Sequence, residues 1–160
     1  DDLPLTKESM LNYHFISLQH KPKLAGKIRD RDVIIGGNVD FKVANHRDIN
    51  LLLDKLVDKY NEYNKLKNKS LKAILNFASY LHNEFQHIHP FFDGNSRTTR
   101  LIIFHFLQMN DIPIFDIPLG MLEEYVFSTK GAKKRDDHKL CKVLQKIILY
   151  NLKTINERLS

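Results

Sequence analysis

Hydrophobic side chains recur at three- and four-residue spacing along most of this chain, a periodicity that is typical of amphipathic helices. Thr6, Asp48 and Ser70 each stand directly before such a pattern, where their side chains can cap the first turn of a helix. Pro90 stops the third pattern, because the residue before a proline disfavours helical geometry, and Pro113 lies just beyond the fourth. The spacing predicts helices over about 6–20, 48–60, 70–88, 95–110, 118–129 and 137–159.

The helix predicted over 95–110 is apolar on nearly every side, with the run from Leu101 to Leu107 at its middle. Such a helix normally lies at the centre of a bundle, so we expect it to be the innermost one. The first helix should contribute Met10, Tyr13, Ile16 and Leu18 to the core. The last should contribute a stripe along one face: Leu140, Val143, Leu144, Ile147, Ile148, Leu152 and Ile155.

The segment from 21 to 43 has a different character. It contains the short run Val33-Ile34-Ile35, followed directly by the pair Gly36-Gly37. A glycine pair between two β-capable stretches is a turn signal, so the segment predicts a small β-hairpin. The expected fold class is therefore all-α, a helical bundle around a buried central helix that carries one hairpin, formed by a single domain over 1–160.

The composition agrees with one globular domain. The chain has 160 residues, of which 42% are hydrophobic and 28% are charged. No apolar run approaches the ~20 residues of a membrane span, so we expect no membrane association. The single cysteine, Cys141, excludes an internal disulfide framework and favours a reducing, cytoplasmic compartment, with delivery as a secreted effector left open. The chain begins Asp1-Asp2 without a methionine, and we interpret it as a piece of a longer or processed protein.

The residues that carry chemistry concentrate between 89 and 100. A tight turn at Asp93-Gly94 precedes the predicted helix that begins near Asn95. The free backbone N–H groups and the dipole of that helix favour an anion, and glycine lets the backbone approach a ligand closely. Arg97 and Arg100 lie one turn apart on the same side of the helix. With a net charge of +6, the arrangement predicts a polyphosphate site.

Two side chains beside this anion site suit phosphate chemistry. Asp93 supplies one carboxylate, and Mg²⁺ characteristically takes one or two carboxylates plus substrate phosphates. His89, on the other wall of the turn, can serve as a general base for an incoming hydroxyl group. A candidate base, a candidate metal ligand, an anion site and the two guanidinium groups of Arg97 and Arg100 thus lie within one short stretch of sequence.

This stretch resembles the core motif of the Fic-domain (Fido) family, His-Pro-Phe-x-Asp/Glu-Gly-Asn-Gly-Arg-x-x-Arg. The matching positions are His89, Pro90, Phe91, Asp93, Gly94, Asn95, Arg97 and Arg100. Ser96 departs from the motif, where the family usually has glycine, although its backbone N–H can still join the anion site. The resemblance covers about 24–130, and the helices over 6–20 and 137–159 complete the bundle.

The resemblance implies a protein adenylyltransferase (AMPylator), which transfers AMP from Mg-ATP to a Ser, Thr or Tyr hydroxyl of a target protein. In such an enzyme His89 would take the hydroxyl proton and Asp93 would hold Mg²⁺. The phosphates would lie on Gly94, Asn95, Ser96, Arg97 and Arg100, with Tyr125 as a candidate wall of the adenine pocket. The target would bind in extended form, by strand addition, to Val33, Ile34 and Ile35, which resemble the family's flap hairpin.

The family also uses an inhibitory helix with the pattern Ser/Thr-x-x-x-Glu-Gly/Asn. No glutamate of this chain is followed by glycine or asparagine, as the positions Glu8, Glu62, Glu84, Glu123, Glu124 and Glu157 show. We therefore expect that a separate partner or a missing N-terminal segment would supply any such inhibition.

Other activities stay open from the sequence. Fic-like Doc phosphotransferases carry lysine at the Ser96 position and alanine at the preceding glycine, so Gly94 favours adenylylation while Ser96 fits neither pattern. Removal of AMP on the same scaffold commonly relies on an added glutamate. A helical DNA-binding regulator is the alternative from another class, but the basic cluster over 130–135 is followed by two aspartates and lacks interleaved aromatics, so we expect no nucleic-acid partner. His82 and His87 are five positions apart, not the four of a His-Glu-x-x-His zinc site.

Overall fold

The computed structural model describes residues 4–112 and 116–160, and this part of the chain forms helices and no β-strand. The α-helices are α1 (Lys7–Ser17), α2 (Ile49–Asn64), α3 (Leu71–Ile88), α4 (Asn95–Gln108), α5 (Leu119–Phe127) and α6 (Asp137–Leu159), and a 3-10 helix, η1 (His46–Asp48), leads into α2. The all-helical prediction is confirmed, while Pro113 lies outside the described residues. None of these helices is long and apolar enough to cross a lipid bilayer.

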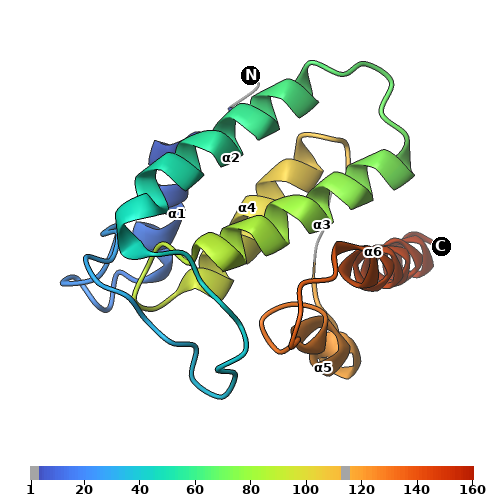
Figure 1. Ribbon diagram of the computed structural model, residues 1–160. Helices are drawn as coiled ribbons and strands as arrows, with labels where there is room; N and C mark the ends of the chain where they lie inside the picture. The colour runs from blue at the N-terminus through green and yellow to red at the C-terminus, as the bar shows by residue number, and fades with distance from the viewer. Residues whose placement is uncertain (1–3, 113–115) are drawn as a thin grey trace.

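The helix with the most helical neighbours is α3, which packs against α2, α4 and α6 (Figure 1). The helix α4 packs against α3 and α1, and α5 packs against α6. The prediction that α4 is innermost is therefore wrong. One side of α4 stays accessible, because Phe104 is 36% exposed and the first turn carries the half-buried polar residues Ser96 and Arg97.

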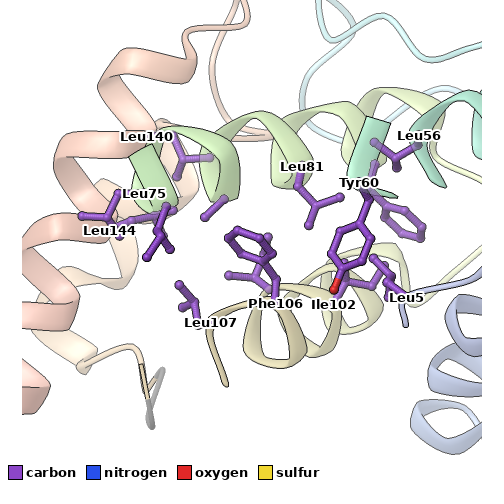
Figure 2. Close-up of a cluster of buried hydrophobic side chains, with 14 of the residues drawn as sticks. Leu5, Leu56, Tyr60, Leu75, Leu81, Ile102, Phe106, Leu107, Leu140 and Leu144 are labelled. Atoms are coloured by element: carbon purple, nitrogen blue, oxygen red, sulfur yellow. The ribbon is translucent and has the colours of Figure 1, made fainter. Parts of the chain in front are cut away.

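The core fills the space between α2, α3, α4 and α6 (Figure 2). Phe106 of α4 lies at its centre, with its ring 6.1 Å from that of Tyr60, 5.6 Å from that of Tyr63 and 5.4 Å from that of Phe77. Each fully buried side chain of this size contributes about 1.5–3 kcal/mol of transfer free energy. The same core therefore holds α3 and α4 together on either side of the loop that connects them.

Capping explains where several helices begin. Thr6 caps α1 in a reciprocal capping box with Ser9, and Ser70 caps α3 by accepting the N–H of Ala73 (3.2 Å), as predicted. Asp48 precedes α2 but makes no capping hydrogen bond, because η1 already places its backbone in helical geometry. The helix α2 also runs four residues past the predicted end, since Tyr63 is buried in the core.

Two residues expected in the core lie at the surface. Ile16 is 51% exposed in the last turn of α1, which ends at Ser17 instead of near residue 20. Leu152 is 43% exposed, because Asn151 is the last buried residue of α6 and the helix continues beyond its neighbours. Hydrophobic periodicity alone does not show where a helix extends beyond the helices that pack against it.

The predicted hairpin over 21–43 is not formed, because this segment contains no strand. A turn does occur at the glycine pair, where Asn38 donates its backbone N–H to the Ile35 carbonyl (3.2 Å). After this turn the Asn38 side-chain amide donates to the carbonyls of Lys130 and Ala132 (2.9 and 3.0 Å). These two bonds tie the chain just after the flap segment, residues 33–36, to the loop between α5 and α6.

Candidate functional site

The loop between α3 and α4, residues 89–94 and here called the motif loop, is held by two residues in left-handed backbone geometry. His89 ends α3 with φ 48°, and Gly94 precedes α4 with φ 80°. A side chain at Gly94 would also collide with the fully buried Leu18, because a Cβ there would lie 2.5 Å from Leu18 Cδ1. Glycine is therefore required at this position both by conformation and by packing.

The Asn95 side chain fixes the motif loop from inside. Its Oδ1 accepts the backbone N–H of Phe91 (3.1 Å), and its Nδ2 donates to the Phe91 carbonyl (2.7 Å). Phe91 and Asn95 are both buried, so these bonds are shielded from water. One amide hydrogen and one oxygen lone pair of Asn95 are thus used within the loop, and its role as a phosphate ligand stays a prediction.

A pocket of about 380 Å³ lies between the flap segment and the start of α4. From the motif and the first turn of α4 it is lined by His89, Phe92, Asp93, Gly94, Asn95, Ser96 and Arg97, and from elsewhere by Val33, Ile34, Ile35, Gly36 and Lys130. The first N–H groups of an α-helix have no acceptor within the helix, and here they belong to pocket-lining residues. The sequence prediction placed nine of these residues at one site, and the structure brings them together. Gly36, Phe92 and Lys130 were not predicted as site residues.

His89 is set up as a neutral base. Burial lowers its pKa from 6.5 to about 4, and nearby Arg29 and Lys130 act in the same direction. Its Nδ1 lies 3.3 Å from the Gln86 carbonyl, which can only accept a hydrogen. The hydrogen of the neutral ring therefore belongs on Nδ1, and Nε2 keeps its lone pair.

Asp93 carries a negative charge in the same pocket. Its Oδ2 accepts a hydrogen bond from Lys21 Nζ (2.6 Å), and its Oδ1 accepts the Gly94 N–H (2.6 Å) and lies 3.6 Å from an Arg97 nitrogen. The hydrogen bond from Lys21 is the main cause that lowers the pKa of Asp93, so the carboxylate is ionised near neutral pH. Within residues 4–112 and 116–160 no cluster of three or more His, Cys, Asp or Glu side chains could hold a metal by itself. A single ionised carboxylate beside an anion site does fit Mg²⁺, which takes its other ligands from phosphates and water.

Arg29 is a supporting residue that sequence reasoning missed. It is 2% exposed and donates to the carbonyls of His89 (2.7 Å, from Nε), Arg31 (2.9 Å) and Ala44. These carbonyls satisfy donors of the buried guanidinium, and the Asp32 carboxylate lies 3.5 Å from its Nη1 as the charge partner. Arg29 joins the motif loop to both sides of the flap segment, across about sixty residues of sequence. No local sequence pattern predicts this role.

His14 of α1 is a second missed residue. Gly26 donates its N–H to His14 Nδ1 (2.9 Å), so the ring hydrogen is on Nε2, which donates to the Asp93 carbonyl (2.9 Å). The ring stacks face to face on Phe91, with centroids 3.6 Å apart. Burial lowers the pKa of His14, which keeps the ring neutral and able to accept from Gly26.

Two predicted site residues lie elsewhere. Tyr125 is 5% exposed in the core, and its hydroxyl pairs with the buried His82, so it is a core residue and not a wall of the pocket. Arg100 lines a separate surface hollow with Phe104 and Leu122 on the α5 side of α4. Three positions on a helix turn the side chain by about 60°, enough to direct Arg97 into the pocket and Arg100 out of it.

Comparison with known proteins agrees with this geometry. The family model described as Fic/DOC family matches residues 4–107. Proteins named Protein adenylyltransferase Fic from Drosophila willistoni and Drosophila persimilis are 32% and 30% identical over 136 and 135 residues, covering 84% of this chain. Those alignments cover 26% and 25% of the relatives, so the chain spans about a quarter of their length.

Solved structures share the fold at low sequence identity. Fic-1 from C. elegans superimposes with a TM-score of 0.83 at 22% identity, covering 97% of this chain and 44% of that chain. BepC, a VirB-translocated effector protein from Bartonella tribocorum with bound AMPPNP, superimposes with a TM-score of 0.67 at 20% identity, covering 89% of this chain and 73% of that chain. The family match includes the motif loop and the flap segment that line the pocket, and the chain belongs to the Fic/DOC family.

Proposed function

We propose that this chain forms a single Fic domain over 1–160 that transfers AMP from Mg-ATP to a Ser, Thr or Tyr hydroxyl of a target protein. The observation that carries the proposal is the shared pocket, in which a neutral histidine, an ionised aspartate and the start of α4 face the flap segment. The names of the Drosophila relatives support adenylylation, and AMPPNP in BepC supports a nucleotide ligand.

His89 is the proposed general base. Its unprotonated Nε2 would take the proton from the target hydroxyl as the hydroxyl oxygen forms a bond to the α-phosphorus. The bond from that phosphorus to the bridging oxygen of the β-phosphate breaks, and pyrophosphate leaves with the electron pair. The left-handed backbone at His89 and the Arg29 bond to its carbonyl hold the imidazole in place before the target arrives.

The start of α4 is the proposed phosphate site. The backbone N–H groups of Ser96 and Arg97 and the Arg97 guanidinium would bind phosphate oxygens, and Lys130 adds positive charge across the pocket. Asp93 would hold Mg²⁺, which would supply positive charge to offset the negative charge that develops on the phosphates. Gly94 contributes by close backbone approach, and Asn95 by keeping the motif loop in shape.

The flap segment is the proposed docking site for the target. Among the residues that the structure describes, no strand pairs with it, and Ile34 is 78% exposed. Apart from the Ile35 carbonyl, which accepts the Asn38 N–H, the backbone groups of the segment are therefore proposed to pair with an extended peptide. This role needs a target protein as partner. Inhibition by a separate partner, or by a segment N-terminal to this chain, is part of the same proposal.

Intact mass spectrometry after incubation with Mg-ATP tests the proposal directly. We expect a gain of about 329 Da on the protein itself or on a target protein, the mass of one transferred AMP. A gain of about 80 Da would instead assign phosphotransfer to this site. The absence of any transfer, together with no binding of a non-hydrolysable ATP analogue, would overturn the assignment of the pocket.

A further inference from the structure

The Lys21 side chain places a fixed positive charge on the proposed metal ligand. Lys21 Nζ lies 2.6 Å from Asp93 Oδ2, although the two residues are 72 positions apart. Neither local sequence nor the motif predicts this pair. Lys21 does not line the pocket, so it approaches the carboxylate from the α1 side.

The turn that carries Lys21 is rigidly attached to the motif loop. Leu18, three residues earlier, is fully buried and packs directly against Gly94. The Lys21 backbone N–H donates to the Leu18 carbonyl (2.7 Å), and the Lys21 carbonyl accepts from Leu24 and Ala25 (2.9 and 3.0 Å). Because the backbone is already ordered, holding the ammonium group near Asp93 costs less conformational entropy than for a free surface lysine.

We propose that Lys21 acts as a resident counter-ion of Asp93 and lowers the affinity of the nucleotide pocket for a divalent cation. This inference rests on the proposed function. A cation that binds Asp93 must either displace the ammonium from Oδ2 or bind beside it and experience its repulsion. Both effects lower the affinity of Asp93 for the cation. Since competition is reciprocal, the incoming metal should also release Lys21 from Asp93.

The expected size of the effect is modest. The Lys21 and Asp93 side chains are 46% and 41% exposed, so water screens the pair and its contribution is that of a surface ion pair. Removal of the lysine charge should therefore tighten divalent-cation binding by about two- to fivefold. Such a change leaves the chemistry of His89 untouched and sets the metal concentration at which the pocket fills.

The test uses Mn²⁺ as the probe, titrated into the full chain with a non-hydrolysable ATP analogue kept below the protein concentration so that little free analogue is left to chelate the metal, with free Mn²⁺ measured by electron paramagnetic resonance. The Lys21→Met variant removes the charge and keeps the side-chain length, and we expect a two- to fivefold lower dissociation constant. Lys23→Met is the matched control. Lys23 is also exposed and makes no hydrogen bond or ion pair in the described part of the chain, so this variant changes the net charge equally and should bind Mn²⁺ like the wild type.

Two outcomes separate this inference from the proposed function. If the wild type binds no Mn²⁺ in the presence of the analogue, or Asp93→Asn binds it equally well, the proposed metal site is wrong and the inference falls with it. If the wild type binds Mn²⁺ through Asp93 and Lys21→Met binds it equally or more weakly, the inference alone is overturned. Weaker binding would mean that Lys21 positions the carboxylate for the metal.

Discussion

The two walls of the pocket are built in opposite ways. The ordered wall is the motif loop with the first turn of α4, and the open wall is the flap segment. The motif loop is fixed by side chains from near and far in the sequence: the adjacent Asn95 bonds the Phe91 backbone, while Arg29 bonds the His89 carbonyl and His14 bonds the Asp93 carbonyl. The flap segment has no strand partner in the described part of the chain, and Ile34 is 78% exposed. One wall is held by hydrogen bonds from several elements, while the other is an irregular segment in which the Ile35 carbonyl accepts the Asn38 N–H.

The difference indicates that the two walls have different functions. Phosphate chemistry needs groups held to within a fraction of an ångström, and buried hydrogen bonds with locked tautomers provide that order. A docking strand needs free N–H and C=O groups, which a closed hairpin would already have used. Arg29 connects the two, since it bonds both the His89 carbonyl and Ala44 beyond the flap segment.

The largest effect should come from the base on the ordered wall. His89→Asn keeps a residue that tolerates the left-handed backbone but removes the ring nitrogen that accepts the proton. We expect AMP transfer to fall by about 10²–10⁴-fold. Transfer is measured with labelled ATP, and binding of a non-hydrolysable ATP analogue should stay within about threefold of the wild type. Retained transfer by this variant would remove His89 from the mechanism.

Breaking the connection between the walls should cost mainly stability. Arg29→Met leaves the carbonyls of His89, Arg31 and Ala44 without their donor, and each buried unsatisfied acceptor costs about 1–3 kcal/mol. We expect the free energy of unfolding, measured by urea denaturation, to drop by about 3 kcal/mol. Arg31→Met is the control, because that side chain is 79% exposed and its removal should cost less than about 1 kcal/mol. Equal losses in the two variants would show that Arg29 does not hold the walls together.

Gly94→Ala tests how tightly the ordered wall is packed. A Cβ at Gly94 meets Leu18 at 2.5 Å and also requires left-handed backbone at φ 80°, so we expect a loss of about 2 kcal/mol. Gly37→Ala has a similar φ of 83° in open space, and it should cost only the conformational part, about 1 kcal/mol. Thermal and urea denaturation of the pair isolate the packing contribution, and equal costs would argue against close contact between α1 and the motif loop.

The ordered wall was largely predictable from sequence because its residues are contiguous. A helix stop, a turn at Asp93-Gly94 and a new helix start define an anion site wherever they occur together, and the structure places His89, Ser96 and Arg97 in that pocket. Local sequence could not show which way each helical side chain turns. For that reason Arg100 was assigned to the wrong side of α4.

What supports the site could not be predicted, because it depends on contacts between residues far apart in the chain. His14, Lys21 and Arg29 lie 60 to 79 positions from the motif-loop groups that they bond. The hairpin prediction was wrong because the segment over 21–43 forms no strand, and the Asn38 side chain beyond its glycine turn bonds the distant loop after α5. Tyr125 was misplaced because burial beside His82 is set by the packing of α5 and not by its own sequence.

Acid should weaken the ordered wall before it affects the rest of the pocket. The pKa of His89 is about 4 in the folded chain and 6.5 in the unfolded chain, so between these values the unfolded state binds more protons. Stability from this group is therefore complete above pH 6.5 and is lost as the pH falls toward 4. Urea denaturation at about pH 7.5 and pH 5 should show a loss that is smaller in His89→Asn by on the order of 1 kcal/mol. An identical pH dependence in both proteins would mean that His89 is not held neutral.

The smallest effect on stability should come from the open wall, and it gives the sharpest test of the comparison. Ile34→Asp replaces a 78% exposed side chain, so the free energy of unfolding should change by less than about 0.5 kcal/mol. Labelling of other proteins in a cell lysate with labelled ATP should fall severalfold, because a charge at the docking strand opposes an apolar side-chain contact. Binding of the ATP analogue is measured in the same variant, because Ile34 also lines the nucleotide pocket, and labelling should fall by more than analogue binding does. Leu119→Asp, at an 89% exposed position on α5, is the matched control and should leave labelling unchanged. Undiminished labelling by Ile34→Asp would mean that targets reach His89 without the flap segment, and the open wall would then be only an irregular loop.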